Sequence, residues 1–587
     1  VARSGASTHG ALGETLVPSW NECFQGLAFP GPSGEIYGPT AINATSANGR
    51  MAAAFDRAGT ITVLRYPRPS YYDQVKYRTS SRAEERYGAL ENEGIFLGLL
   101  VPGEGTTWLR DTPHEQRYVT DTSDTVEVVH GVAELGVEVT VTDTVAPDHD
   151  ALVRAVEVRV VDAAVAPDEL EVVAFENLNL TVNRIPYFPV MDWCADELNV
   201  DTATFDADAD AIVHEVSGLD QAAATEASVA MAMGFDRSSA QVQVGGDAFE
   251  GTALPAGQPP LPTQDAYLDA ADGTLSGNGS YHGQTTGALT AAVDLSDDGA
   301  DRVDLVLAGG ADATGATATL DAVRGLTAED PDAVVAAKQA WFDAQLADAP
   351  MPGTDDADVL AVARRALVSL MSVVDHDSGA IVASIATQSP YGEDWPRDGA
   401  FFDHVLDLIG QHDLVAQRLR WYAELQSDGS PGPTLDGLLE PVVIPAGNWA
   451  MNYYADGVVG GPIPWEIDET GYMLWAFWDH VAARGDDAVP VLRDVWPAVV
   501  RAADFLTTCV DPTSGLQCVA IEDDNPQPSQ TIHGAGPIWM GLDSAVKAAE
   551  VLGEDDAAAR WAARRDELGD AIESELTADG VVGGGNG

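Results

Sequence analysis

The apolar residues change their spacing within Thr327-Ala-Glu-Asp-Pro-Asp-Ala-Val-Val-Ala-Ala-Lys-Gln-Ala-Trp-Phe-Asp-Ala-Gln-Leu346. Upstream of this stretch they alternate with polar residues, as in half-buried strands, whereas from Thr327 they recur at i, i+3 and i+4, as on one face of a helix. Residues 328–346 are therefore predicted to form a connecting helix, which Pro350-Met-Pro-Gly-Thr354 ends. The sequence thus predicts a multidomain fold with a β part followed by an α part.

The β part is predicted to be a β-sandwich domain over residues 1–320. Residues 50–64 indicate a hairpin that turns at Arg57-Ala-Gly59. Further strands are expected where apolar and polar residues alternate, at 126–145, 151–161, 170–182 and 303–308. Residues 207–299 are rich in Ala, Asp, Gly, Ser and Thr, which is typical of long loops and edge strands.

The α part is predicted to comprise a helical linker over residues 321–354 and a catalytic domain over residues 355–587. The helical period predicts seven helices in that domain, at about 355–372, 397–410, 412–427, 468–484, 487–509, 535–552 and 554–577. No strand is expected between them, which favours a ring or bundle of helices over a parallel sheet. A helical toroid is the specific prediction.

The charge of the chain is strongly one-sided. It carries 93 acidic and 30 basic residues, a formal net charge of −63, and its only lysines are Lys76, Lys338 and Lys547. So much negative charge repels itself in dilute buffer, whereas molar salt shortens the Debye length to about 3 Å and screens it. The acids are spread along a chain that is 45% hydrophobic, which favours a halophilic globular protein over an acidic disordered tail. Nucleic acid and anionic membranes are excluded as partners.

The cysteines and the first residues carry less information. Cys23, Cys194, Cys509 and Cys518 lack the spacing of metal ligands, and buried thiols are favoured over a disulfide. No apolar run is long enough to span a membrane. The start, Val1-Ala-Arg-Ser-Gly5, shows no signal peptide, which favours a cytoplasmic protein, although removal of an export signal fits as well.

The first loop with residues suited to binding or catalysis is Tyr391-Gly-Glu-Asp-Trp-Pro-Arg-Asp-Gly-Ala-Phe401. It places Trp395 beside Arg397 and Asp398, where the loop turns into a helix. The C–H face of a sugar ring packs on an indole, and vicinal hydroxyls pair with a guanidinium and a carboxylate. A carbohydrate site is the interpretation; the alternative is a helix cap with a local ion pair.

The second loop contains Trp465-Glu-Ile-Asp-Glu-Thr-Gly471, just before a helix rich in aromatic residues. Acidic residues favour the first turn of a helix, which is the ordinary explanation for this cluster. We interpret Trp465, Glu466 and Asp468 as a substrate wall, and Trp475, Phe477 and Trp478 as core.

The third loop contains Val519-Ala-Ile-Glu-Asp-Asp-Asn525, followed by Gln530-Thr-Ile-His-Gly534. In so acidic a chain, an acidic run is usually a solvated surface. Apolar neighbours and nearby acids would instead raise the pKa of Glu522, which suits a general acid.

Together the three loops resemble the glucoamylase family, glycoside hydrolase family 15, in motif, order and spacing. The resemblance extends to its bacterial and archaeal branch over nearly the whole chain. It implies an N-terminal β-sandwich (super-sandwich) followed by an (α/α)6 toroid, and an inverting hydrolase that releases glucose from non-reducing ends of α-glucans. It further implies that Glu522 is the general acid, and that the substrate is bound by Trp395, Arg397, Asp398, Trp465, Glu466, Asp468 and Asp523.

Three departures bear on this transfer. Ile521 stands where the family usually has Trp, Asp523 stands where a second Glu is usual, and Glu466 stands where Gln is common. Seven helices and a connector also fall short of twelve, so the toroid is expected to be incomplete at the C-terminus. The family's catalytic base lies far beyond its acid, whereas Gly587 follows Glu522 by only 65 residues. We expect the catalytic base to lie beyond residue 587 and the chain to be a fragment. We also expect this chain alone to have little activity.

The alternatives are a trehalase or a glucodextranase of the same family, and a truncated, non-catalytic glucan-binding protein. The expected partner is an α-glucan oligosaccharide or polysaccharide bound by a monomer. No cofactor is expected; bacterial relatives can hold a structural calcium ion, but the sequence indicates no site for one.

Overall fold

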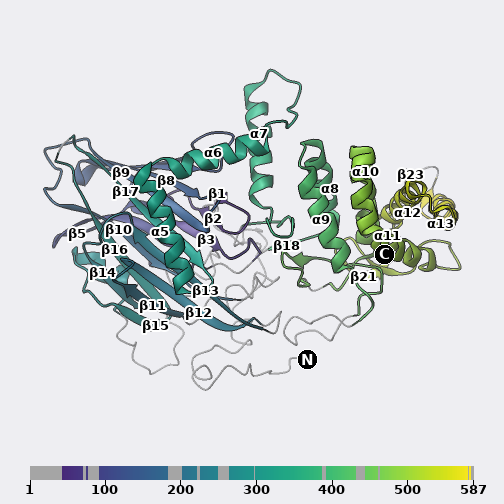
Figure 1. Cartoon of the computed structure of the whole chain (residues 1–587), viewed down its shortest axis with the longest axis horizontal. Helices are drawn as coiled ribbons and strands as arrows, with labels where there is room; N and C mark the ends of the chain where they lie inside the picture. Colours follow the sequence, from purple (N-terminus) through teal and green to yellow (C-terminus); the bar gives the residue numbers. More distant parts are fainter. Residues whose placement is uncertain are drawn as a thin grey trace. The chain divides into compact units, whose positions relative to one another are not determined.

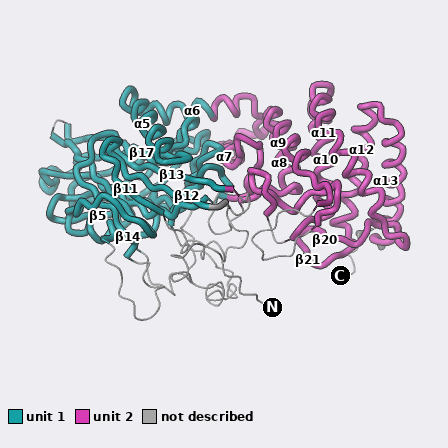
Figure 2. The backbone as a smooth tube through the Cα atoms, turned by 60° about the horizontal axis from the view of Figure 1, so that its bottom comes forward, with its two compact units in different colours: residues 1–219, 226–341, 385–390 teal, residues 220–225, 342–384, 391–587 magenta. Residues whose placement is uncertain are grey.

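A computed structural model describes residues 43–70, 74–76, 91–182, 201–220, 225–248, 264–296, 298–385, 392–430, 443–460, 463–578 and 581–582. The chain divides into two compact units (Figure 2). Unit 1 comprises residues 1–219, 226–341 and 385–390, and unit 2 comprises residues 220–225, 342–384 and 391–587. Strands dominate the first unit and helices the second (Figure 1). The predicted order of a β part and an α part is confirmed.

Unit 1 contains two large antiparallel sheets. Among the described residues the first has eight strands, in the order β1-β2-β3-β4-β10-β16-β14 with β5 paired to β4. Its strands are β1 Ala44–Ala47, β2 Ala52–Phe55, β3 Ile61–Arg65, β4 Ile95–Val101, β5 Gly105–Trp108, β10 Leu170–Asn177, β14 Val242–Gly246 and β16 Thr285–Val293. The hairpin predicted over residues 50–64 is β2–β3, and Gly59 takes the positive φ that its turn requires.

The second sheet has nine described strands, in the order β15-β11-β12-β13-β17-β9-β8-β7-β6. They are β6 His114–Tyr118, β7 Val126–Val132, β8 Val137–Val145, β9 Ala151–Val160, β11 Asp201–Asp206, β12 Ala211–Asp220, β13 Thr225–Phe235, β15 Ser280–Gly283 and β17 Ala300–Gly310. The run 126–145 is thus two strands. They turn at Gly136, whose φ of +61° and whose contact with Asp162 leave no room for a side chain.

Successive side chains of a strand point to opposite faces of its sheet, so the sequence of each strand determines which residues are buried on each face. Val172 and Ala174 of β10 point into a core shared by both sheets, together with Val156 of β9. Phe175 faces the other way, where it packs with Phe96, Trp108 and Tyr267 under the short helix α4 (Ala266–Asp269). The nine-stranded sheet is covered on its outer face by helix α5 (Ala313–Glu329), through Ala316, Leu320 and Val323.

Two predictions for this region need correction. Residues 207–299 were expected to form long loops and edge strands; β14 and β15 are edge strands, but β12 and β13 lie inside the nine-stranded sheet, where β13 pairs with β17. Small residues such as Ala230 and Ala232 are buried there beneath α5, so tertiary packing outweighs their weak strand propensity. The single connecting helix over 328–346 is instead α5 and α6 (Ala333–Gln345), because Pro331 lacks the amide that would continue the first helix.

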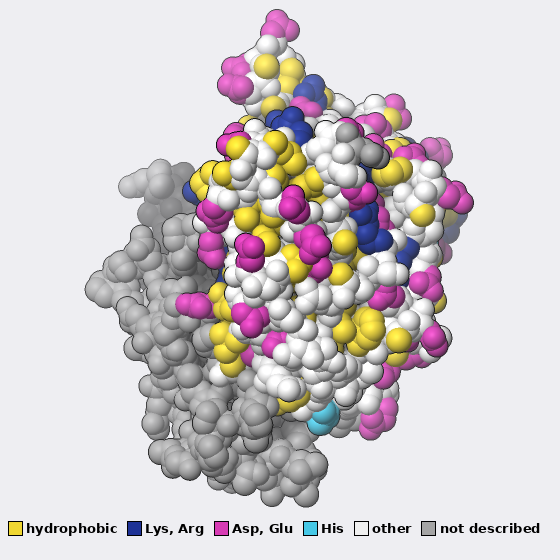
Figure 3. All heavy atoms as spheres, turned by 90° about the vertical axis from the view of Figure 1, so that its left-hand side faces the viewer, with side chains coloured by type: hydrophobic (Ala, Val, Ile, Leu, Met, Phe, Trp, Pro, Cys, Tyr) yellow, Lys and Arg dark blue, Asp and Glu magenta, His cyan; other side chains and the backbone are white. Residues whose placement is uncertain are grey.

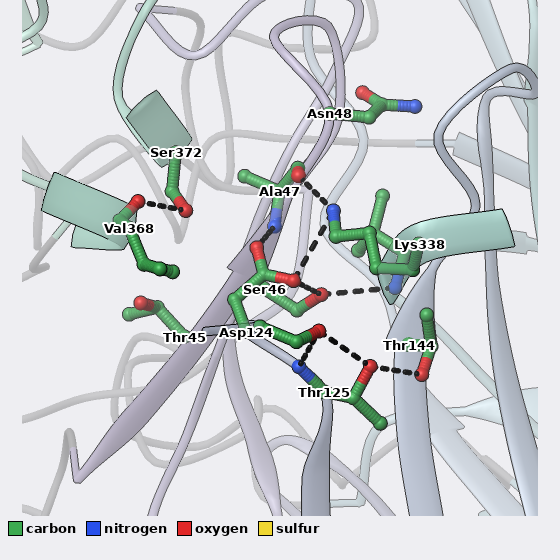
Figure 4. A network of polar contacts seen from close by, with 12 residues as sticks. Thr45, Ser46, Ala47, Asn48, Asp124, Thr125, Thr144, Lys338, Val368 and Ser372 are labelled. Carbon is green, nitrogen blue, oxygen red and sulfur yellow. Dashed lines mark hydrogen bonds and ion pairs between the residues drawn. The ribbon is translucent and has the colours of Figure 1, made fainter. Parts of the chain in front are cut away.

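Helix α6 is fastened to the β-sheet by Lys338 (Figure 4). The buried ammonium donates to the Ala47 carbonyl and lies 3.2 Å from the Asp124 carboxylate, which also accepts the Ala47 amide at 2.9 Å. Lys76 is likewise buried, with Nζ 2.7 Å from Asp247. Of the three lysines only Lys547 is exposed, so surface cations are almost entirely Arg. On the face drawn in Figure 3, acidic side chains are scattered and do not form one patch.

Unit 2 contains all seven predicted helices within two or three residues of their expected ends. They are α7 Ala357–Ser372, α8 Pro396–Leu408, α9 His412–Leu425, α10 Ile467–Arg484, α11 Val489–Thr508, α12 Ile532–Leu552 and α13 Asp555–Glu575. From α8 onward they form two layers, because α8, α10 and α12 pack side by side, as do α9, α11 and α13. The first layer is tightest where α10 crosses α12: a side chain at Gly471 would lie 2.3 Å from the Pro537 carbonyl.

Candidate active site

The three loops singled out in the sequence converge on the N-terminal ends of α8, α10 and α12. Pro396 begins α8 at a position where its missing amide costs nothing, and Thr531 caps α12 by accepting the His533 amide. The third loop forms a hairpin between β20 (Ala520–Glu522) and β21 (Asn525–Ser529). Since α8, α10 and α12 share one layer, their first turns carry side chains from distant parts of the chain to one edge.

Arg397 is the cation at the centre of this edge. Its Nη1 donates to Asp468 Oδ2 at 2.7 Å and to Glu466 Oε2 at 3.3 Å. Its Nη2 lies 3.1 Å from Asp524 Oδ1. The guanidinium therefore joins the first loop to both of the others. The sequence predicted Arg397, Glu466 and Asp468 as neighbours in one site, but not that Asp524 would contact the arginine.

The buried carboxyl groups around Arg397 outnumber its single positive charge. Burial raises the pKa of Glu466 to about 7, although Arg397 opposes the shift. The pKa of Asp468 is also raised by burial, again against Arg397. Glu469 is completely buried, and neither of its carboxylate oxygens has a hydrogen-bond partner among the described residues. Burial, and then the charge of Glu466, raise the pKa of Glu469 well above its usual range.

The turn between β20 and β21 is held by its backbone. Asp523 and Asp524 have φ of +51° and +58°, the conformation of a two-residue hairpin turn, which Asp tolerates better than most residues. The Asp523 amide donates to Asp468 Oδ1 at 3.3 Å, and the Asp524 amide donates to Glu466 Oε1. Two buried carboxylates of α10 thus fix this strained turn in place.

Glu522 is buried directly before that turn, with 2% of its surface exposed. Its Oε1 accepts from Gln517 Nε2 at 2.6 Å, and its Oε2 accepts from the Thr531 amide at 2.9 Å and the Thr531 hydroxyl at 2.7 Å. Burial raises the pKa of Glu522 and outweighs these donors, and Asp468 adds to the rise. Gly534 is required beside it, since a Cβ there would lie 2.1 Å from Glu522 Oε1.

A disulfide closes the segment that leads to Glu522. Cys509 and Cys518 are bonded, with Cα atoms 4.8 Å apart, so the expectation of buried thiols is wrong for this pair. The backbone pairing of Val510 with Gln517 brings the two cysteines face to face, which their separation of nine positions in the sequence does not reveal. Cys23 and Cys194 lie outside the described residues. Because Gln517 is next to Cys518, the crosslink restrains a hydrogen-bond donor of Glu522.

The remaining predicted residues have different environments. Trp395 is buried at the start of α8, and Trp465 is half-buried with its indole edge-on to Phe505, 6.0 Å between ring centroids. The carboxylate of Asp398 is exposed in the first turn of α8. Asp523 presents its amide to the site, whereas its exposed carboxylate lies 3.1 Å from His533 Nδ1. Tyr391, the first residue of the first loop, lies outside the described residues.

The aromatic run of α10 divides between core and surface. Phe477 is buried, as predicted, but Trp475 and Trp478 are only half-buried. Trp475 packs against Phe401 of α8, with ring centroids 5.1 Å apart, and Phe401 remains half exposed.

A buried network beneath the first loop was not predicted. Arg418 of α9 donates to both oxygens of Asp394, at 2.8 and 2.6 Å, and to Asp403 Oδ2 at 2.5 Å. The Tyr422 hydroxyl adds a bond of 2.8 Å to Asp394. These groups hold the segment that precedes Trp395. Asp394 lies within the motif of the first loop, so its position indicated a role near the site. Nothing in the sequence distinguishes Arg418 from a surface residue of a helix.

The site combines one guanidinium with buried carboxyl groups whose pKa values are raised by burial. It can therefore bind hydroxyl groups and supply a proton to a leaving oxygen. Among the described residues, no group of three or more His, Cys, Asp and Glu side chains is arranged to hold a metal ion. No helix in the described part of the chain is both long and apolar enough to cross a bilayer.

Comparisons with known proteins give a short match in sequence and longer matches in fold. No protein-family model matches the chain. An uncharacterised glycosyl hydrolase of Methanocaldococcus jannaschii is 26% identical over 149 residues, which is 25% of this chain and 21% of that relative. The chain thus matches about a fifth of the length of this curated relative.

Two solved structures share the fold. A bacterial glucoamylase complexed with acarbose superposes with a TM-score of 0.62 at 12% identity, over 94% of this chain and 69% of that one. A putative kojibiose phosphorylase from the human microbiome superposes with a TM-score of 0.53 at 8% identity, over 92% and 69% of the two chains. At such identities the likeness concerns the fold: large antiparallel sheets followed by paired helices.

Proposed function

We propose that this protein is a glycoside hydrolase in which Glu522 protonates the glycosidic oxygen of the leaving group. The single observation that carries the proposal is the placement of Glu522. Its carboxyl is buried, its pKa is raised by burial, and it directly precedes the turn whose amides bind Asp468 and Glu466, the partners of Arg397. A proton donor beside a group that can bind hydroxyls is what cleavage of a glycosidic bond requires.

The finer proposal is a glucoamylase-like enzyme that releases glucose from non-reducing ends of α-glucans with inversion. Arg397 and Asp398 would bind hydroxyls of the terminal glucose, with Trp395, Trp465, Glu466, Asp468 and Asp523 around them. The two layers of helices and the likeness to the glucoamylase structure support an (α/α)6 toroid as the architecture. The matched proteins, an uncharacterised glycosyl hydrolase and a bacterial glucoamylase complexed with acarbose, support the substrate class.

Inversion requires a second carboxylate about 6.5–9.5 Å from the acid, with room for the attacking water. Glu466 and Asp468 are engaged by Arg397, so we assign the role of base to neither. The net charge of −63 supports a protein that works in molar salt, as a monomer on a neutral glucan.

The test is glucose release from maltotetraose in 2 M KCl by the full-length protein, as the wild type and as Glu522→Gln. The Gln side chain keeps the size and the acceptor oxygen but cannot donate an acidic proton. Glu424→Gln, an exposed change on α9, removes the same charge elsewhere. We expect Glu522→Gln to lose at least about 100-fold in kcat, the lower range for a general acid, and Glu424→Gln to match the wild type.

Equal release by the wild type and Glu522→Gln would refute the assignment. NMR of the first product, α- or β-glucose, reports the stereochemistry. Trehalose and isomaltotetraose as substrates separate a trehalase or a glucodextranase from a glucoamylase. Maltotetraose binding without any glucose release would favour the alternative of a non-catalytic glucan-binding protein.

A further inference from the structure

We propose that Asp524 is a specificity-determining residue that pairs with Arg397 when no sugar is bound and is displaced by a sugar hydroxyl. This inference rests on the proposed function, because it concerns how the same site admits a neutral saccharide. It starts from an imbalance: three carboxylates, those of Glu466, Asp468 and Asp524, contact one guanidinium.

The three carboxylates differ in how firmly they are held. The side chains of Glu466 and Asp468 are 0% and 1% exposed, whereas that of Asp524 is 61% exposed. The distances to the guanidinium do not rank the three carboxylates in the same way, at 2.7 Å for Asp468, 3.1 Å for Asp524 and 3.3 Å for Glu466, so exposure is the property that sets Asp524 apart. An exposed ion pair contributes little, whereas breaking a buried one leaves an uncompensated charge. Asp524 is therefore the partner that a ligand can replace at the lowest cost.

The backbone of the turn allows this exchange without a larger rearrangement. The amides of Asp523 and Asp524 remain bound to Asp468 and Glu466 whether or not the Asp524 side chain moves. Only side-chain torsions of Asp524 have to change. Rotation toward solvent also moves a negative charge away from Glu466 and Glu469. The charge of Asp524 raises the pKa of both groups.

Displacement exposes Arg397 Nη2 to the ligand. Nη1 is already shared between Asp468 and Glu466, so Nη2 is the nitrogen that can donate to a hydroxyl. The remaining carboxylates reject an anionic sugar by charge. The competition between Asp524 and the ligand weakens as salt rises, because molar salt screens an exposed pair far more than a buried one.

The test is calorimetric binding of maltotetraose by Glu522→Gln protein, which binds without turnover, with and without Asp524→Asn. Asn accepts the positive φ of this position and keeps the amide that donates to Glu466, but it no longer carries the charge that competes for Arg397. At 0.5 M KCl we expect Asp524→Asn to bind about threefold more tightly, within the range measured for exposed ion pairs. Raising KCl to 3 M should tighten binding by the Glu522→Gln protein and leave the double variant unchanged. Glu424→Gln in the same background is the charge-matched control, and circular dichroism at each salt concentration confirms folding.

Equal affinities with and without Asp524→Asn overturn the inference while leaving the proposed function intact. Weaker binding by Asp524→Asn would overturn it as well, because the carboxylate would then be a direct ligand of the sugar. Equal tightening by Glu424→Gln would assign the effect to net charge and refute a specific role. Absence of maltotetraose binding in every variant would remove both the proposed function and the inference that rests on it.

Discussion

Gly534→Ala should displace the Glu522 carboxylate and little else. Gly534 lies in the first turn of α12, and a Cβ at that position would be 2.1 Å from Glu522 Oε1, 2.4 Å from its Cδ and 2.9 Å from Gln517 Nε2. Ordinary contact begins at 3.4 Å, so the carboxylate has to retreat by more than 1 Å. The backbone of α12 cannot yield instead, because it crosses α10 in close contact at Gly471 and Gly541.

The expected cost follows from the bonds that this movement breaks. The carboxylate accepts one bond from Gln517 and two from Thr531, each of them between 2.6 and 2.9 Å. Losing one or two bonds to a charged acceptor costs about 1.5–6 kcal/mol, since each contributes about 1.5–3 kcal/mol. Replacing a helical Gly by Ala returns about 1 kcal/mol. Gly534→Ala should therefore lower the free energy of unfolding of unit 2 by about 0.5–5 kcal/mol.

The matched control is Gly536→Ala, two residues later in the same helix, where a Cβ meets nothing within 4 Å. It should gain about 0.5–1 kcal/mol through helix propensity alone. The assay is urea denaturation in 2 M KCl, followed by circular dichroism, together with the kcat of glucose release. A displacement of 1 Å should reduce kcat about 100-fold in Gly534→Ala and not in Gly536→Ala. Equal stability and equal kcat for the two variants would refute the placement of Glu522 against Gly534.

Two further predictions concern protons and the disulfide. The pKa of Glu466 is raised to about 7 by burial, so the folded protein holds this proton more tightly than the unfolded chain, and the unfolding free energy falls as pH rises from about 4.5 to 7. Glu466→Gln removes this loss. The unfolding free energy of the variant should equal that of the wild type near pH 4.5 and exceed it by about 1–3 kcal/mol above pH 7. A difference that does not change with pH, measured by urea titration, would contradict the assignment. Replacing Cys509 and Cys518 with Ser should lower the unfolding free energy by about 2–3 kcal/mol, as expected for opening a short loop. The control is the wild type, measured with and without reductant. If the double variant were as stable as the wild type without reductant, the crosslink would not constrain the unfolded chain.

The helices and the site loops were predictable to different depths. The helices of unit 2 could be placed within a few residues, because the apolar period and the Pro and Gly residues that punctuate it are local properties. The proximity of Arg397, Glu466 and Asp468 was also predicted, although it came from the motifs and their resemblance to a family. The strands β12 and β13 were missed, because small residues become core only when another element covers them.

What the sequence determined by itself is the set of local preferences: a β part followed by an α part, the helical period of unit 2, and the acidic composition. The change from strand to helix was expected near Thr327, but it lies between Gly310 and Ala313. Only the tertiary structure decided which charges meet. It placed Asp524 on Arg397, Arg418 on Asp394, Gln517 on Glu522 and Cys509 on Cys518. It also buried Glu469 without a hydrogen-bond partner among the described residues. The physical reason is that hydrogen bonds, ion pairs and burial depend on distances across the fold, and residue type and spacing along the chain do not specify these distances.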